Sequence, residues 1–319
     1  MKILVIGGTG HVGSYLVPRL VLSGHEVCVI CQSGRPRYSD PRLAWPRVTW
    51  VLADRRAEEQ DGTWQTRMAR MDTDVVIDLI CFTPEQNRIM VEAFEGRISH
   101  FLHCGSLWAY GPSPRTPYRE SDPRRPIGEY GRGKAAIEAD LMERFRQSGF
   151  PATVVHPGHI SGRKWLPIDP QGTRNGTEVY RKLAHGEVVH LPQYGRETLH
   201  HVHGDDVAQM FERALTHREA ALGESFSAVS PYAMSLVGCC QFVASLFGKE
   251  PNIAFVTLTE LETLLGSEAC ATTLSHIEHS PCSSIEKART LLGYSPRDTT
   301  EQIYQECIEY MLEMGELIL

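Results

Sequence analysis

The sequence has no long apolar run and no excess of basic residues. None of its apolar stretches approaches the ~20 residues that a membrane-spanning helix requires, so we expect no membrane partner. The apolar stretch at 3–6 is short and leads directly into glycines, unlike a secretory signal, and we therefore expect a cytoplasmic protein. With 32 Lys and Arg against 39 Asp and Glu, the formal net charge is −7. This balance argues against a nucleic-acid partner, which requires a basic surface.

The sequence also lacks the paired clusters that a metal site requires. Cys28 and Cys31 form a C-x-x-C within an apolar, strand-like run, but no second pair completes a zinc site. His201, His203 and Asp205 alternate on one face of a predicted strand, again without a second cluster. We expect no metal and interpret the nine cysteines as buried thiols of a reducing cytosol. His203 is instead a candidate for the polar wall of a substrate pocket.

What the sequence does have is an alternation of strand-like and helix-like segments. Segments such as 14–24 and 134–149 carry apolar residues at helical spacing and end in glycine. Continuous apolar strands separated by helices predict a parallel sheet that is covered on both faces. The predicted strands cover residues 2–8, 25–31, 48–54, 74–82, 100–106 and 151–158.

The predicted fold class is therefore α/β, a doubly wound parallel Rossmann sheet with a smaller, interleaved C-terminal substrate domain. Residues 158–197 are rich in Gly, Pro and polar residues, as expected of loops around a site. The segment 197–215 returns to a strand and a helix, with Asp205 or Asp206 placed to cap the helix. We assign the dinucleotide-binding domain to residues 1–157 and 198–229, and the substrate-binding cap to residues 158–197 and 230–319.

Residues 7–13, GGTGHVG, join the first predicted strand to the first predicted helix. A G-x-G-x-x-G pattern and a G-x-x-G-x-x-G pattern overlap there. Such a turn lets the backbone approach a pyrophosphate and presents helix N–H groups to the phosphate charge. Because the chain continues as strand, helix and strand, we predict a dinucleotide site; the alternative is a tight turn with no ligand. The predicted contacts are Gly7, Gly10, His11, Val12 and Gly13.

The end of the second predicted strand indicates which dinucleotide binds. An acidic residue there would bind the ribose 2′-hydroxyl of NAD, but no acid occurs between Glu26 and Asp40. Gln32, Ser33 and Arg35 follow the strand instead, and an arginine and a hydroxyl favour the 2′-phosphate of NADP. We therefore predict NADP in preference to NAD as the cofactor. The alternative is that Arg35 belongs to a solvated loop.

The stretch EYGRGKAAIEADL indicates the chemistry. Tyr130 and Lys134 are four residues apart in a predicted helix, so they lie on one face, a turn apart. A free tyrosine has a pKa of about 10 and is a poor base at neutral pH. An ammonium at ~4 Å contributes on the order of 4 kcal/mol at an effective dielectric of ~20, enough to lower that pKa by up to about 3. We predict that Tyr130 is an acid–base group and that Lys134 also holds the cofactor ribose; the alternative is that both are surface residues.

With these residues the chain resembles the extended short-chain dehydrogenase/reductase family, which includes nucleotide-sugar epimerases and dehydratases. The resemblance covers nearly the whole chain and rests on GGTGHVG, LAD, HCGSLWAYG, YGRGK, HPGHISG, VHGDDVA and EKARTLLGYSP. It implies that Ser106 binds the substrate oxygen beside Tyr130, and that Asp54 contacts the cofactor adenine. It also implies hydride transfer between a nicotinamide and a carbinol or carbonyl carbon, with Tyr130 as the acid–base group.

The same resemblance implies further contacts and a partner. The HPGH turn would bring Pro157 and His159 near the nicotinamide, and Leu79 and Ile80 would also contact the cofactor. Trp108 and His159 would contact a small-molecule substrate. Because relatives pair through the active-site helix and the helix before HFLHCGS, we expect a homodimer.

The sequence departs from the family's nucleotide-sugar enzymes at two positions. Leu199 stands where they usually carry an arginine for the substrate diphosphate, although Arg196 lies three residues earlier. An asparagine that usually helps to hold the diphosphate is missing from HPGHIS. These departures favour a smaller alcohol or ketone, or a differently bound sugar. Three hypotheses stay open: an NAD(P)-dependent oxidoreductase, a redox-neutral nucleotide-sugar epimerase or dehydratase, and a cofactor-sensing regulator without turnover.

Overall fold

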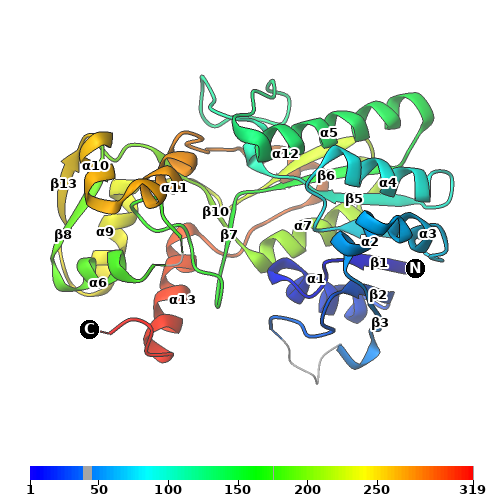
Figure 1. The fold of residues 1–319 in the computed structure, drawn as a ribbon, viewed down its shortest axis with the longest axis horizontal. Helices are drawn as coiled ribbons and strands as arrows, with labels where there is room; N and C mark the ends of the chain where they lie inside the picture. The colour runs from blue at the N-terminus through cyan, green and yellow to red at the C-terminus, as the bar shows by residue number, and fades with distance from the viewer. Residues whose placement is uncertain (39–44, 175, 319) are drawn as a thin grey trace.

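The computed structural model describes residues 1–38, 45–174 and 176–318. Its centre is a parallel sheet of seven strands in the order β11-β6-β5-β4-β1-β2-β3 (Figure 1), which confirms the predicted α/β fold class. The strand order reverses between β1 and β4, and ligands of such sheets bind at the carboxyl ends of the strands beside this reversal. The strands are β1 (Lys2–Ile6), β2 (Glu26–Cys31), β3 (Thr49–Leu52), β4 (Val75–Asp78), β5 (His100–Cys104), β6 (Ala152–Pro157) and β11 (Glu224–Ala228).

Helices cover both faces of this sheet, which explains why its central strands β1, β2 and β4 are mainly apolar. Successive side chains of a strand point to opposite faces, and those of β1 enter two separate cores. One core includes α1 (His11–Leu22) and α7 (Gly204–Thr216), and the other includes α4 (Pro84–Phe94) and α5 (Gly128–Ser148). Burying one such aliphatic side chain contributes about 1.5–3 kcal/mol. The shorter helices around the sheet are α2 (Arg55–Asp61), α3 (Thr63–Ala69), α8 (Arg218–Ala221) and α12 (Glu286–Leu292), with 3-10 turns η1 (Trp45–Arg47) and η2 (Leu107–Ala109).

A smaller part of the chain, with a hydrophobic core of its own, lies at the other end of the molecule (Figure 1). It is built around the parallel strands β8 (Val188–Pro192) and β13 (Asn252–Val256). The short strand pair β9 (Thr198–Leu199) and β12 (Met234–Ser235) completes it. A second short pair, β7 (His159–Ser161) with β10 (His201–His203), packs Ile160 and Val202 against the core that includes α1 and α7. The helices of the smaller part are α6 (Glu178–His185), α9 (Leu236–Leu246), α10 (Leu258–Leu265), α11 (Ser267–Ile277) and α13 (Thr300–Glu313). The domain bounds given above stay our proposal.

Two details of this region differ from the sequence-based expectation. Residues 158–197 are not loops throughout, because β7, α6 and β8 lie within them; α6 buries Val179, Tyr180 and Leu183 on one face of a short helix. Neither of the predicted aspartates caps α7.

The start of α7 is capped by His203, whose Nδ1 accepts the Asp205 N–H at 3.2 Å. The two aspartates have other partners in the tertiary structure. Asp205 pairs with Arg19 at 2.7 Å, and Asp206 accepts the backbone N–H of Arg297 at 2.9 Å. These distant partners could not be inferred from the local sequence.

Within the three described ranges, no three His, Cys, Asp or Glu side chains gather closely enough to hold a metal ion. All nine cysteines are free thiols. In the same ranges, no helix combines the length and the apolar character needed to cross a membrane.

Candidate active site

The glycine turn forms the floor of the candidate site at the carboxyl end of β1. Gly7 has φ +81°, and a Cβ at Gly13 would lie 2.4 Å from the backbone of Gly8, so larger residues would block the turn. Gly10 precedes α1 without any side-chain cap. The first amide groups of α1 therefore keep their hydrogen-bonding capacity for an anion, as a cofactor pyrophosphate would require. The turn fits a dinucleotide.

A cavity of about 340 Å³, here called the central cavity, opens over this turn. It brings many of the predicted cofactor contacts together with the predicted catalytic residues, although they come from five separate parts of the chain. The predicted residues that line it are Gly7, Gly10, His11, Val12, Gly13, Leu79, Ile80, Ser106, Tyr130, Lys134 and Pro157. Sequence reasoning missed Phe82, Cys104, Gly105, Gly158, Ile160 and Trp165, which also line it.

A second cavity of about 230 Å³, the side cavity, shares Ser106 and Tyr130 with the first. Two predicted substrate contacts, Trp108 and His159, line it. His159 is buried, and neither of its ring nitrogens has a hydrogen-bond partner among the residues that the structure describes. A neutral imidazole can donate one hydrogen bond and accept another, so the buried ring of His159 suits a polar ligand. The side cavity also contains Leu107, Gly158 and Ile160, which lie within the quoted motifs without an assigned role, and Trp165, Arg174, His276 and Pro281, which no motif indicated.

Lys134 is buried in the helix α5, and its ammonium group is held by backbone oxygens. Its Nζ donates to the carbonyl oxygens of Cys81 at 2.7 Å and of Cys104 at 2.6 Å. Burial lowers the pKa of Lys134. An ammonium group has three donors, so one remains for a ligand in the central cavity.

Tyr130 differs from the sequence-based expectation in its acidity. The side chain is 42% exposed, yet burial raises its pKa to about 12, while Ser106 acts in the opposite direction and lowers it. Lys134 Nζ lies 5.8 Å from the Tyr130 ring centre and is directed to carbonyl oxygens instead. The predicted lowering of the phenol pKa by Lys134 is therefore wrong for this structure, because desolvation is the larger effect.

Ser106 follows β5 and begins the turn η2. Its Oγ accepts the N–H of Trp108 at 3.2 Å, and the residue is 9% exposed. Ser106 thus presents a hydroxyl at the boundary of the two cavities, beside Tyr130.

The remaining predicted contacts lie outside both cavities. Gln32, Ser33 and Arg35 are exposed after β2, where Gly34 turns the chain with φ +62°. Asp54 follows β3 and caps α2 by accepting the Ala57 N–H at 3.2 Å.

His203 was expected in the wall of the substrate pocket, but it lines neither cavity. Its Nε2 faces Glu306 of α13 at 3.1 Å, while its Nδ1 caps α7. Burial is the largest single effect and lowers the pKa of His203. The carboxylates of Glu306, Asp298 and Asp206 together outweigh burial, so the pKa is raised overall. The position of His203 is explained by these two contacts.

The parallel sheet, the glycine turn and the cavity beside the strand-order reversal define a dinucleotide-binding protein of the Rossmann class. Residues 3–228 match the model of the NAD dependent epimerase/dehydratase family, and the chain belongs to this family. The family resemblance predicted from the motifs is confirmed.

Individual relatives in this family differ in their reactions. The chain is 26% identical over 220 residues to a 2'-dehydrokanamycin reductase of Streptomyces kanamyceticus, covering 69% of this chain and 59% of that protein. It is 24% identical over 325 residues to a UDP-glucose 4-epimerase of Lacticaseibacillus casei, covering 93% and 92%. A solved UDP-glucose 4-epimerase of Thermotoga maritima with UDP-glucose has a TM-score of 0.71 at 19% identity, covering 99% of this chain and all of that one. This last likeness concerns the fold alone.

Proposed function

We propose that this chain is an NAD(P)-dependent oxidoreductase that transfers hydride at a carbinol or carbonyl carbon of a small molecule. The observation that carries the proposal is the central cavity, which Ser106, Tyr130 and Lys134 line together with the glycine turn. A reactive carbon held there would lie beside both a dinucleotide and an acid–base group. The bound nicotinamide would supply or accept the hydride.

Each of the three residues has a distinct role in this proposal. Tyr130, with a pKa of about 12, is protonated at neutral pH and donates its proton to the substrate oxygen during carbonyl reduction. Ser106 orients that oxygen through its hydroxyl. Lys134 uses its remaining N–H to hold the cofactor ribose, since its other two are bound to Cys81 and Cys104.

NADP is the favoured cofactor in this proposal. The loop after β2 carries Gln32, Ser33 and Arg35, which are all exposed and available to a 2′-phosphate. Gly34 has the positive φ that the proposed turn toward the adenosine ribose requires. Asp54, at the end of the neighbouring strand, would contact the adenine.

A redox-neutral epimerase or dehydratase is the second candidate, and the match to nearly the full length of a UDP-glucose 4-epimerase favours it. Two side chains weigh against a nucleotide sugar. Leu199 is fully buried in β9 and offers no charge to a diphosphate, while Arg196 lies over the ring of Tyr194 at 5.6 Å. The third candidate, a cofactor-sensing regulator without turnover, is less favoured because it would not need the acid–base residues Tyr130 and Lys134.

The stoichiometry of cofactor use separates these candidates. Purified protein is incubated with an excess of NADPH and a panel of small ketones and keto sugars. In a parallel series it is incubated with UDP-sugars and NAD⁺ or NADP⁺, because epimerisation or dehydration begins with oxidation of the sugar. An oxidoreductase consumes one NADPH for each product formed. Isomerised or dehydrated UDP-sugar without net NADPH consumption would identify the second candidate, and no product in any series would favour the regulator.

We also propose, from the family, that the chain forms a homodimer through α4 and α5. Light scattering should then give about twice the 35.8 kDa of one chain. A mass equal to that of one chain would contradict the dimer.

A further inference from the structure

A fully buried imidazole lies directly behind the backbone of Ser106. His156 belongs to β6, the strand beside β5, and is 0% exposed. Its Nδ1 lies 3.1 Å from the backbone nitrogen of Ser106 and 2.9 Å from its carbonyl oxygen. One ring atom can therefore fix the main chain of Ser106, either by accepting the N–H or by donating to the carbonyl oxygen.

Gly105 makes this approach possible. A Cβ at Gly105 would lie 2.5 Å from Nδ1 of His156, closer than real side chains come, so a larger residue would displace the ring. The glycine in the motif HCGS is thus explained by the imidazole behind it.

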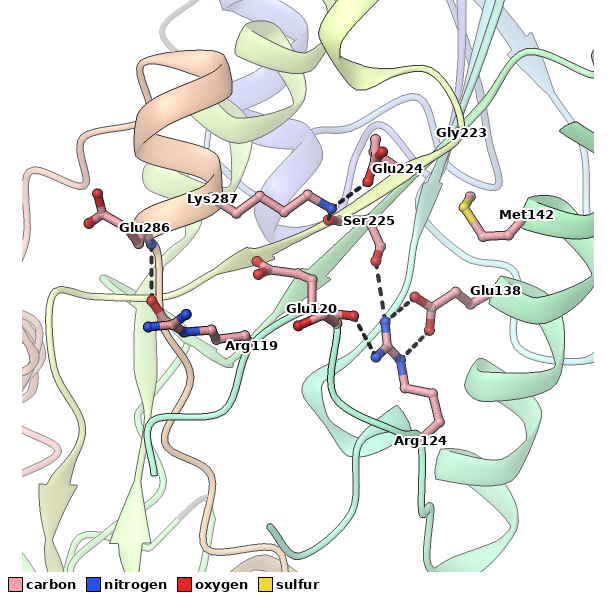
Figure 2. A pocket seen from close by; sticks show the side chains of 12 residues that line it. Arg119, Glu120, Arg124, Glu138, Met142, Gly223, Glu224, Ser225, Glu286 and Lys287 are labelled. Carbon is pink, nitrogen blue, oxygen red and sulfur yellow. Dashed lines mark hydrogen bonds and ion pairs between the residues drawn. The ribbon is translucent and has the colours of Figure 1, made fainter. Parts of the chain in front are cut away.

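The opposite side of the ring faces a buried ion pair. His156 Nε2 lies 3.2 Å from Oε1 of Glu138, a residue of α5 that is 5% exposed. Figure 2 shows Glu138 beside Arg124, whose Nε donates to Glu138 at 2.7 Å. Arg124 also donates to the Glu120 carbonyl oxygen at 2.9 Å and to Ser225 Oγ at 3.3 Å. The guanidinium is therefore fixed from several sides, and Glu138 is fixed by it.

This ion pair determines which nitrogen of His156 carries a proton. Burial raises the pKa of Glu138, but its contacts with the His156 ring and the Arg124 guanidinium outweigh burial and hold that pKa well below its usual range. The carboxylate stays ionised and favours a proton on the adjacent Nε2. In the neutral ring Nδ1 is then unprotonated, and it accepts the Ser106 N–H.

We infer that His156 is a positioning residue: its Nδ1 holds the main chain of Ser106, so that the hydroxyl stays beside Tyr130. Glu138 and Arg124 orient the ring from behind. The inference rests on the proposed function, because it concerns the group that orients the substrate oxygen. It adds His156, a residue of β6 that does not itself line either cavity.

Two substitutions of the same residue separate positioning from packing. In His156→Asn the side-chain amide lies near the place of Nδ1, and in His156→Gln it lies near the place of Nε2. We expect His156→Asn to keep kcat within about threefold and His156→Gln to lower it about tenfold or more, since small misplacements of catalytic groups have large effects. The KM and the Kd for NADPH should change by less than about twofold in both, because Ser106 acts on the reaction more than on binding.

His100→Asn is the matched control, because His100 is also fully buried in β5 and hydrogen-bonds Thr153 at 2.8 Å, yet lies at the far end of that strand. It should lower the melting temperature while kcat stays unchanged. Equal kcat values for the Asn and Gln variants of His156, or a larger loss in His156→Asn, would overturn the inference.

A second measurement does not depend on turnover. In protein labelled with ¹⁵N-serine, the Ser106 amide should exchange its hydrogen at least about tenfold faster in His156→Gln than in His156→Asn, because only the latter keeps an acceptor for it. If the wild-type protein turns over no substrate, the proposed function fails while this result still supports the positioning. Equal exchange rates would overturn the positioning itself.

Discussion

The Nζ atom of Lys134 lies 2.6 Å from the carbonyl oxygen of Cys104, two residues before Ser106. This hydrogen bond joins the helix that carries Tyr130 to the strand that leads into Ser106. The same ammonium reaches Cys81 O at 2.7 Å, after β4. One buried charge thus connects three elements that surround the central cavity.

Replacing Lys134 by methionine should therefore affect the cofactor and the reaction together. The variant keeps much of the side-chain volume but loses the charged donor, and a hydrogen bond to a charged group contributes about 1.5–3 kcal/mol. We expect the Kd for NADPH to rise about tenfold or more and kcat to fall as well. Titration of NADPH fluorescence and a steady-state assay measure the two. If neither changes, Lys134 has no role in the site.

The raised pKa of Tyr130 predicts opposite pH profiles for the two reaction directions. With a pKa of about 12, the phenol is the dominant form at neutral pH and is lost only as the pH rises toward that value. The rate of carbonyl reduction should therefore not fall through deprotonation of Tyr130 between about pH 6 and 9. Alcohol oxidation needs the phenolate, so its kcat/KM should rise about tenfold per pH unit in that range. A plateau in the oxidation profile below about pH 8 would show that the pKa is far lower in the working enzyme.

The cofactor preference tests the loop after β2. We expect NADP(H) to bind at least about tenfold tighter than NAD(H), and Arg35→Ala to remove most of that difference, since a charge-assisted hydrogen bond contributes about 1.5–3 kcal/mol. Arg70→Ala, at another exposed arginine, serves as the control. Titrations on nucleotide-free protein give both dissociation constants. Equal affinities, or a preference for NAD(H), would assign Arg35 to a solvated loop.

The sheet and the glycine turn were predictable because their physical causes lie within short segments. A strand buried on both faces is apolar at successive positions, as in residues 3–6 of β1, and the turn requires glycine where a Cβ would collide, as at Gly13. The spacing of Tyr130 and Lys134 likewise places both on one face of α5. Such features depend on residues a few positions apart.

The missed features depend on residues far apart in the chain. Arg174 and His276 reach the side cavity from the smaller part of the molecule, and no local pattern indicates that. The acidity of Tyr130 depends on its burial rather than on the nearby lysine, and only the packed structure determines burial. The position of His203 likewise depends on Glu306, over one hundred residues along the chain.

The Tyr130→Phe variant tests the proposed oxidoreductase most directly, because it removes one hydroxyl from the central cavity and leaves the ring. The measurement compares kcat for NADPH-dependent carbonyl reduction in wild type, Tyr130→Phe and Tyr194→Phe, a control at a tyrosine that is 70% exposed. Loss of a general acid–base group should lower kcat by about 10²-fold or more, with the Kd for NADPH nearly unchanged, while Tyr194→Phe keeps full activity. Turnover by Tyr130→Phe at a rate close to that of the wild type would contradict the role of Tyr130 and the mechanism built on it.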